Sequence, residues 1–303
     1  MGYKGQAGTA VSRSSVFQIC FLVFQSSLPK SRLPLSPVVM CEKYMSIKTI
    51  IIACTLLISI PLLTSCSTFN TYKVAVFPPS WMNLIQIDKD IYVEKEMNED
   101  LREKLIIQAE ESKKYVIEVW GEIKSNPTIY ACATKKCAES LGLIGLAHCV
   151  SSYLILQPKA FTKFIISHET SHAEVVKRSG GFLKWKKIPQ WFDEGLAVVV
   201  GPDPRHNKIA WEKIIKEQLP HPSKKELMSI HSIREWNKAT GKYNENLDYD
   251  SIVVTYATAG HYVGEWYSKA GKSGLLQLFE RIKNGLSFEK AYKEAIETTS
   301  LTN

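Results

Sequence analysis

The spacing of apolar residues along the chain predicts short strands and one long helix ahead of a helical region. Polar and apolar residues alternate over Asp90–Glu94, as they do in a short strand. Over residues 98–120 apolar side chains recur every three or four positions, which predicts an amphipathic helix that Gly121 ends. Two further apolar segments, residues 127–132 and 152–156, have the length and composition of strands.

The pattern changes at residue 159, after which the sequence predicts helices almost to its end. Loops are expected at residues 201–206 and 241–246, where glycine and polar residues gather. Elements in this order predict an α+β fold, with a small N-terminal lobe of strands and helix and a mainly helical C-terminal lobe.

Residues 45–65 contain the parts of an export signal. Lys48 supplies a positive charge, residues 50–63 form an apolar run, and Leu63-Thr64-Ser65-Cys66 follows the run. The run is too short to span a bilayer comfortably as a helix. The segment resembles the signal peptide of a bacterial lipoprotein, in which Cys66 would become lipidated. An uncleaved membrane anchor is the alternative.

This interpretation divides the chain at the signal. Residues 1–44 come before it and are explained by an over-extended gene start or by a disordered extension. After it we expect a tether over residues 66–87 and a folded domain over residues 88–303. Ser67, which follows the lipidated cysteine, resembles the residue found in lipoproteins of the outer membrane. We therefore expect the protein to be anchored at the periplasmic face of that membrane.

Composition and charge place the chain among globular proteins. Its 303 residues are 45% hydrophobic and 22% charged, which excludes a disordered chain. The net charge of +8 is concentrated at the front, because residues 1–65 hold six basic groups and one acidic group. Residues 66–303 hold 32 basic and 29 acidic groups, a net charge of only +3. So small an excess does not favour nucleic acid as a partner.

Three cysteines follow Cys66, and an exported location permits disulfides. Cys132 and Cys137 are separated by four residues of an expected loop and could pair, which would leave Cys149 free. The other pairings stay open, since spacing does not choose among them. A zinc site built from these cysteines has poor support, because a single C-x4-C pair with one further cysteine is a weak ligand pattern.

His168 and His172 belong to the most informative chemical pattern. Over residues 161–176 the apolar residues and both histidines share one helix face, because positions four apart lie one turn apart. The two imidazoles can then reach a single metal ion, with Glu169 beside them. Without a metal, two histidines on a buried face would need other partners for their ring nitrogens. The pattern therefore predicts a metal site of the H-E-x-x-H kind.

A third ligand is predicted on the next helix. Gly180 and Gly181 end the first helix and Pro189 begins the second, so the second helix can present Glu194 to the histidine pair. A helix-start acid is the alternative for Glu194. Two motifs, His168-Glu169-Thr170-Ser171-His172 and Trp191-Phe192-Asp193-Glu194-Gly195-Leu196-Ala197, resemble those of the gluzincin zinc metallopeptidases of the compact peptidase-MA-like type.

The resemblance implies one Zn²⁺ ion held by His168, His172 and Glu194. It implies hydrolysis of peptide bonds by a zinc-activated water, with Glu169 as the general base. The partners would be a peptide or protein substrate and, through the lipid, a membrane. The resemblance also implies a zincin-like fold, in which Tyr153–Leu156 would be the edge strand that borders the cleft.

The remaining site residues have alternatives. Tyr256 is the first candidate and His261 the second for stabilising the developing oxyanion, although Tyr256 could equally be a core aromatic residue. Asp193 either orients a metal ligand or is a helix-start acid. The other histidines, among them His206, lack ligand spacing and are expected to be ordinary surface or core residues. A non-catalytic zinc-binding lipoprotein that acts as a binding or assembly module is the alternative function.

Overall fold

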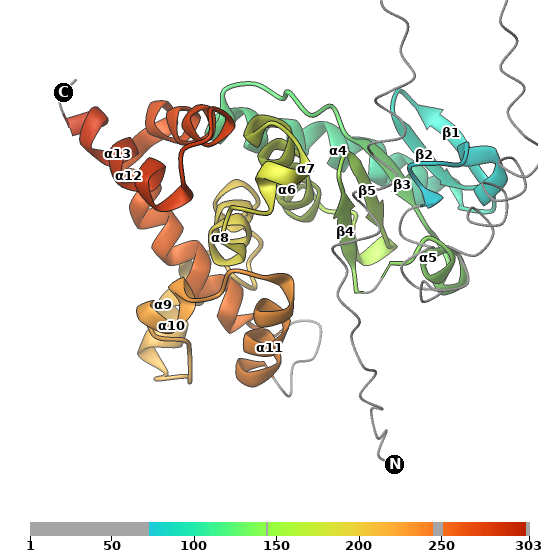
Figure 1. Cartoon of the computed structure of the whole chain (residues 1–303). Helices are drawn as coiled ribbons and strands as arrows, with labels where there is room; N and C mark the ends of the chain where they lie inside the picture. The colour runs from blue at the N-terminus through green and yellow to red at the C-terminus, as the bar shows by residue number, and fades with distance from the viewer. Residues whose placement is uncertain (1–72, 144, 245–250, 301–303) are drawn as a thin grey trace, which may run out of the picture. The chain divides into compact units, whose positions relative to one another are not determined.

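The computed structural model describes residues 73–143, 145–244 and 251–300 (Figure 1). All of them belong to one compact unit, residues 57–303. The predictions for residues 1–44, for the export signal and for Cys66 lie outside the described residues. Within the described ranges, no helix combines the length and the apolar character that crossing a membrane requires.

A five-stranded mixed sheet forms the N-terminal lobe, with the strand order β1-β2-β3-β5-β4. The strands are β1 (Leu84–Asp88), β2 (Ile91–Glu94), β3 (Thr128–Ala131), β4 (Ala147–Val150) and β5 (Tyr153–Leu156). β2, β3 and β5 are parallel, while β1 and β4 pair antiparallel with their neighbours at the two edges. Parallel neighbours need a crossover connection, and helix α4 (Glu99–Trp120) supplies it between β2 and β3.

The edge strand is β4 and not, as the resemblance implied, Tyr153–Leu156. β5 is paired on both sides, with β3 and with β4. Its last three residues are apolar and fully buried, as expected of an inner parallel strand. β4 was missed because Ala147–Val150 is short and has few of the residue types typical of strands.

The packed structure begins before residue 88. Val74 is buried, a 3-10 helix η1 covers Pro79–Met82, and Leu84 at the start of β1 joins a buried cluster with Tyr130. The predicted tether is therefore wrong for residues 74–87. A strand as short as β1 is stable only when a neighbour pairs with it, and β2 is that neighbour.

Helix α4 follows its predicted limits. The side chain of Asn98, the N-cap, accepts a hydrogen bond from the backbone N–H of Leu101 at 2.9 Å. Gly121 follows the helix with a φ of 83°, which only glycine adopts at little cost. Leu105 packs in the cluster under the sheet and Val116 in the core of the helical lobe. α4 therefore contributes to both cores.

The remaining elements in the described part of the chain are helices, which confirms the α+β fold. The helices are α5 (Lys135–Ser140), η2 (Pro158–Ala160), α6 (Lys163–Ser179), α7 (Phe182–Trp185), α8 (Gln190–Val200), α9 (Lys208–Lys216), α10 (Lys224–Met228), α11 (Ile233–Tyr243), α12 (Val254–Lys283) and α13 (Phe288–Ser300). The loop predicted at residues 201–206 is confirmed. The loop predicted at residues 241–246 begins later, because α11 continues through Tyr243.

Helices α8 and α12 approach each other closely in the helical lobe. A Cβ atom at Gly195 would lie 2.6 Å from the carbonyl oxygen of Ala259, so a larger residue does not fit there. Next to this contact, the ring of Phe192 lies 5.2 Å from Trp266 and 5.0 Å from Phe288 of α13. This aromatic core holds the first turns of α8, which carry Glu194.

Candidate functional site

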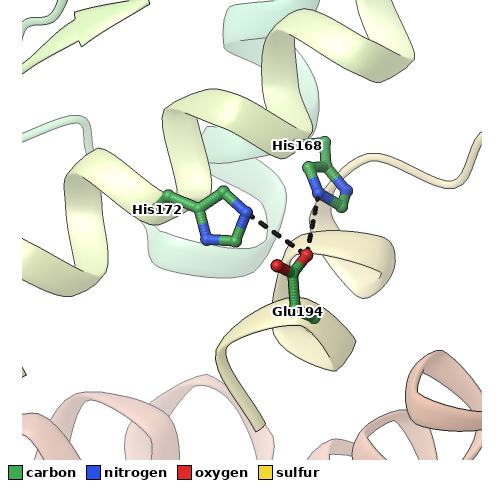
Figure 2. A group of neighbouring side chains, drawn as sticks. All are labelled: His168, His172 and Glu194. Atoms are coloured by element: carbon green, nitrogen blue, oxygen red, sulfur yellow. Dashed lines mark ion pairs between the residues drawn. The ribbon is translucent and has the colours of Figure 1, made fainter. Parts of the chain in front are cut away.

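Helices α6 and α8 bring His168, His172 and Glu194 together (Figure 2). The Nε2 atoms of His168 and His172 lie 3.5 Å and 3.6 Å from Oε2 of Glu194. One ligand atom from each residue can be chosen so that all lie within 4.8 Å of one another. The i, i+4 spacing on α6 places the two imidazole rings 5.0 Å apart. The three side chains could therefore hold one metal ion.

The distances from the two histidines to Glu194 are those of atoms that bind one cation together, and they are longer than those of good hydrogen bonds. Ligand atoms about 2.1 Å from one ion at tetrahedral angles lie roughly 3.4 Å apart. The separations of 3.5 Å and 3.6 Å are close to this value and too long for good hydrogen bonds. Oε2 of Glu194 is buried and has no hydrogen-bond partner among the described residues. A buried carboxylate oxygen in this state is costly unless a cation lies beside it.

Neighbouring side chains orient the candidate ligands. Nε2 of Gln190 donates to Oε1 of Glu194 at 2.9 Å, which leaves Oε2 toward the histidines. Nδ1 of His172 lies 3.0 Å from Oδ1 of Asp193, whose exposed fraction is 1%. Asp193 therefore has the contact that a ligand-orienting residue needs, and it also lies in the first turn of α8. Gln190 was not predicted, although it lies one helical turn before Glu194.

The charges of this cluster shift two pKa values in the metal-free protein. Burial disfavours the charged form of His172, but the carboxylates of Asp193 and Glu194 outweigh it and raise the pKa of His172 well above its ordinary value. Burial also opposes the Glu194 carboxylate, yet His172 and His168 hold the pKa of Glu194 well below its ordinary value. Glu194 is therefore ionised, as a metal ligand must be.

The connection between the two ligand helices begins with two glycines. Gly180 ends α6 with a φ of 91°, and Gly181 follows with a φ of 106°. Both values lie in the left-handed region that favours glycine. Pro189 is the N-cap of α8, at the position where its fixed φ costs little. The predicted end of α6 is confirmed, whereas Pro189, expected in the first turn of the second helix, directly precedes it.

Glu169 lies on α6 beside His168 and has an exposed fraction of 8%. Strand β4 passes close to it. Burial, and then the negative charges of Glu169 and Asp193, raise the pKa of the Cys149 thiol on β4 well above its ordinary value. The edge of the sheet therefore borders the part of α6 that carries the candidate general base.

Tyr256 and His206 lie next to His168. Their ring centroids are 5.9 Å and 5.8 Å from that of His168, and 5.6 Å from each other. Burial and the charge of Glu194 raise the pKa of Tyr256, so its hydroxyl stays protonated. Burial and the nearby His168 lower the pKa of His206 to about 3. His206 was expected to be an ordinary histidine, because no local pattern connects it with the H-E-x-x-H motif.

His261 lies on a different face of α12. It follows Tyr256 by five residues, a rotation of about 140° around a helix. Its ring stacks on Trp211, with centroids 4.4 Å apart and an interplanar angle of 13°. Its Nε2 atom lies 3.5 Å from Glu265. The structure thus places His261 in this stack and Tyr256, the first candidate, beside the candidate ligand His168.

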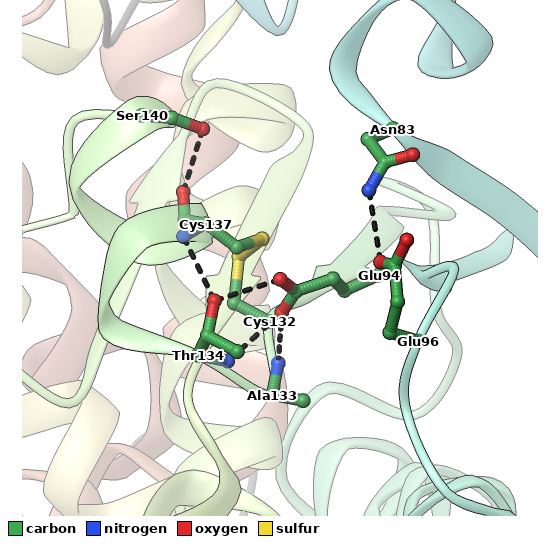
Figure 3. Close-up of a disulfide and its surroundings, with 8 residues drawn as sticks. All are labelled: Asn83, Glu94, Glu96, Cys132, Ala133, Thr134, Cys137 and Ser140. Atoms are coloured by element: carbon green, nitrogen blue, oxygen red, sulfur yellow. Dashed lines mark hydrogen bonds between the residues drawn. A yellow bond between two sulfur atoms is a disulfide. The ribbon is translucent and has the colours of Figure 1, made fainter.

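Cys132 and Cys137 form a disulfide, with Cα atoms 5.5 Å apart (Figure 3). Of the pairings that the sequence left open, this is the one that forms, and Cys149 is a free, half-buried cysteine. A zinc site built from the three thiols is therefore not formed.

The segment between the bonded cysteines is partly helical, where a loop was expected. The side chain of Thr134 caps α5 and accepts a hydrogen bond from the backbone N–H of Cys137 at 3.1 Å. Glu94, at the end of β2, accepts a hydrogen bond from the hydroxyl of Thr134 at 2.7 Å. It also accepts two backbone N–H bonds at 2.8 Å from residues 133 and 134 (Figure 3). These bonds join the disulfide loop to strand β2 of the sheet. The loop leads into α5 and is separate from α6 and α8, which carry the candidate ligands.

Comparisons with protein-family models, with curated proteins and with solved structures gave no match for this chain. The functional interpretation therefore depends on the site itself. Two imidazoles and a carboxylate could hold one ion, Glu169 follows His168 on the same helix, and the ring of the protonated Tyr256 lies beside that of His168. Such a group can bind a divalent cation and supply both a proton acceptor and a proton donor next to it.

Proposed function

We propose that this protein is a zinc metallopeptidase. The observation that carries the proposal is the convergence of His168, His172 and Glu194 from two helices, with Glu169 beside His168. Three protein ligands of the nitrogen and oxygen kinds are typical of catalytic zinc, whereas structural zinc sites use four. The two motifs that resemble those of gluzincins contain all four residues.

The roles of the surrounding residues follow from their positions. Zn²⁺ held by the three ligands would lower the pKa of a water molecule and polarise a substrate carbonyl group. The Glu169 carboxylate would accept a proton from the attacking water and pass it to the nitrogen of the leaving amine. The protonated hydroxyl of Tyr256 would donate a hydrogen bond to the carbonyl oxygen as negative charge develops there. His206 contacts the rings of Tyr256 and His168 and would line the same space.

Strand β4 favours an extended peptide as the substrate. β4 is an edge of the sheet, and β5 is its only strand neighbour in the described part of the chain. Its outer backbone groups could therefore pair with a peptide in the extended conformation. Such a peptide would lie close to Glu169, because Glu169 is near enough to Cys149 of β4 for its charge to raise the pKa of that thiol.

The burial of the ligands supports the second candidate function, a non-catalytic zinc protein that acts as a binding or assembly module. The side chains of His168, His172 and Glu194 have exposed fractions of only 10%, 15% and 11%. A metal ion would fit such a site even if no peptide could enter. The two candidates therefore differ in cleavage and not in zinc content.

The test compares the full chain with its Glu169→Gln variant. Bound zinc is measured by elemental analysis and cleavage with a library of peptides. We expect stoichiometric zinc in both proteins, cleavage by the parent, and a loss of about 10²-fold or more in the variant. Glu110→Gln, at an exposed glutamate paired with Lys113, is the matched control and should cleave like the parent. Zinc in both proteins with cleavage by neither would support the non-catalytic candidate, and no zinc in either would refute the metal site.

We also propose that Cys66 carries a lipid that anchors the protein to the periplasmic face of the outer membrane. The support is the order of charge, apolar run and cysteine over residues 45–66. Mass spectrometry of the N-terminal peptide should find acyl chains on Cys66, and Cys66→Ser should remove them. An unmodified Cys66 in a precursor that keeps residues 45–65 would instead indicate an uncleaved anchor.

A further inference from the structure

The two carboxylate oxygens of Asp193 have different partners. Oδ1 lies 3.0 Å from Nδ1 of His172. Oδ2 accepts a hydrogen bond from Nε1 of Trp185 at 2.8 Å. Asp193 has an exposed fraction of 1%, so these protein groups replace the water that an exposed carboxylate would bind. A chain of hydrogen bonds therefore leads from Trp185 through Asp193 to a candidate metal ligand.

Trp185 belongs to the connection between the ligand helices. It is the last residue of α7, and its ring packs on Phe182 with centroids 5.2 Å apart. Lys184, its neighbour, donates a hydrogen bond to the carbonyl oxygen of Lys283 at the end of α12. α7 is thus attached to another helix, which limits the positions that the indole N–H of Trp185 can take.

The chemistry of the indole determines what this contact does. The indole N–H can only donate, so Oδ2 of Asp193 must be the acceptor. A bond of this kind fixes the orientation of the Asp193 carboxylate and directs Oδ1 toward His172. In the neutral His172 ring, Nδ1 then carries the proton and donates a hydrogen bond to Oδ1, which leaves the lone pair of Nε2 toward Glu194. Only that tautomer of a neutral histidine can bind a metal through Nε2.

We propose that Trp185 is a positioning residue for the metal site, acting on His172 through Asp193. The proposal rests on the proposed zinc function, and it adds a residue that lies outside both motifs. In this proposal, a residue of α7 fixes the orientation and the tautomer of His172, a candidate ligand on α6.

The first test is the zinc affinity of the full chain, measured by competition with a chromophoric chelator. Trp185→Phe removes the N–H group and keeps an aromatic ring, and we expect its affinity to fall roughly threefold to tenfold, less than the 10- to 100-fold typical of a direct partner of a ligand. Trp211→Phe is the matched control. It removes an indole N–H from the stack with His261, which lies on a different face of α12 from Tyr256, and its zinc affinity should stay unchanged.

A double-mutant cycle separates positioning from a general structural role. If Trp185 acts through Asp193, the affinity of Asp193→Asn should not fall further when Trp185→Phe is added. Fully additive losses would overturn the proposal, and so would a Trp185→Phe variant that binds zinc like the parent. If that variant fails to fold, benzothienylalanine at position 185 keeps the shape of indole and lacks only the N–H donor.

A metal-free measurement makes this proposal testable apart from the zinc function. In the metal-free full chain, the Nδ1 proton of His172 should give a protected NMR resonance that weakens in Trp185→Phe and persists in Trp211→Phe. A resonance that is unchanged in Trp185→Phe would refute the positioning role. Absence of zinc binding by the parent would instead refute the proposed function, whatever the resonance shows.

Discussion

Gly201 lies directly against the backbone of His168. A Cβ atom at position 201 would lie 2.6 Å from the amide nitrogen of His168 and 3.0 Å from its Cα atom, and it would also clash with the carbonyl oxygen of Phe164. Gly201 is the C-cap of α8, and His168 lies in the middle of α6. The absence of a side chain at Gly201 therefore sets how closely the two ligand helices approach.

Gly201→Ala should destabilise the protein and weaken the metal site. The added methyl group meets backbone atoms, which cannot rotate away, so we expect a loss of about 1–3 kcal/mol in the free energy of unfolding. Denaturant titration measures this loss, and chelator competition measures the zinc affinity. In the control Gly264→Ala, the new Cβ atom would lie 3.9 Å from Val199, an ordinary contact, and the helix propensity of alanine should stabilise α12. Equal stability of the two variants would contradict the close approach at Gly201.

Removal of zinc should lower the thermal stability. At a free zinc concentration 100 times the dissociation constant, binding contributes about 2.7 kcal/mol to the free energy of unfolding. Calorimetry with and without a chelator should therefore show a lower melting temperature without zinc. Glu194→Gln removes the carboxylate ligand, so its melting temperature should respond little to the chelator. A large response in that variant would place the zinc elsewhere.

Tyr256→Phe should reduce kcat by about 10²-fold while zinc remains bound. The change removes the hydroxyl that we propose to donate to the oxyanion and keeps the aromatic ring beside His168. Steady-state kinetics on a cleaved peptide, with zinc analysis of the same samples, measures the effect. His261→Gln is the comparison, because His261 stacks on Trp211 and should leave kcat unchanged. The reverse result would restore His261 as the oxyanion residue.

Glu174→Ala should destabilise the fold by about 3–5 kcal/mol, because it leaves a buried arginine without its carboxylate partner. Glu174 is fully buried and accepts a hydrogen bond from Nε of Arg178 at 2.6 Å. It also accepts backbone N–H bonds from Lys124 and Ser125 at 2.7 Å and 2.6 Å. Denaturant unfolding measures the loss. The exposed glutamate of the Glu110–Lys113 pair is the control, and its replacement by alanine should cost less than about 1 kcal/mol.

Alkaline pH should destabilise the sheet through Tyr130. Burial, and then the neighbouring Tyr153 and Tyr92, raise the pKa of Tyr130 to about 12. In the unfolded chain a tyrosine ionises near pH 10, as estimated for a free side chain. Between these values the unfolded state loses a proton that the folded state keeps, so the free energy of unfolding falls as the pH rises.

Denaturant titrations between about pH 9 and pH 12 test this prediction, over the range in which an ordinary tyrosine ionises. Tyr130→Phe should reduce the slope of stability against pH, while Tyr262→Phe measures the effect of losing a tyrosine from α12. An unchanged slope in Tyr130→Phe would show that the phenol ionises in the folded protein as readily as in the unfolded chain.

Features that depend on neighbours in the chain were predicted well. The N-cap Asn98 and the terminating Gly121 mark the ends of α4, since each acts within one helical turn. The pairing of Cys132 with Cys137 was among the open possibilities and is confirmed, because five residues keep the two cysteines close. The hairpin strand β4 was missed, because a strand at Ala147–Val150 depends on pairing with β5 more than on its own composition.

The sequence by itself determined the set of candidate ligands: His168 and His172 share a helix face through their spacing, and Glu194 belongs to a second recognisable motif. Only the tertiary structure decided which distant residues join them. In the folded chain, Tyr256 and His206 lie beside His168. His261 instead stacks on Trp211. The indole N–H of Trp185 donates to Asp193. Helical periodicity carries information over a few residues, whereas these contacts depend on how whole helices pack, which no local pattern records.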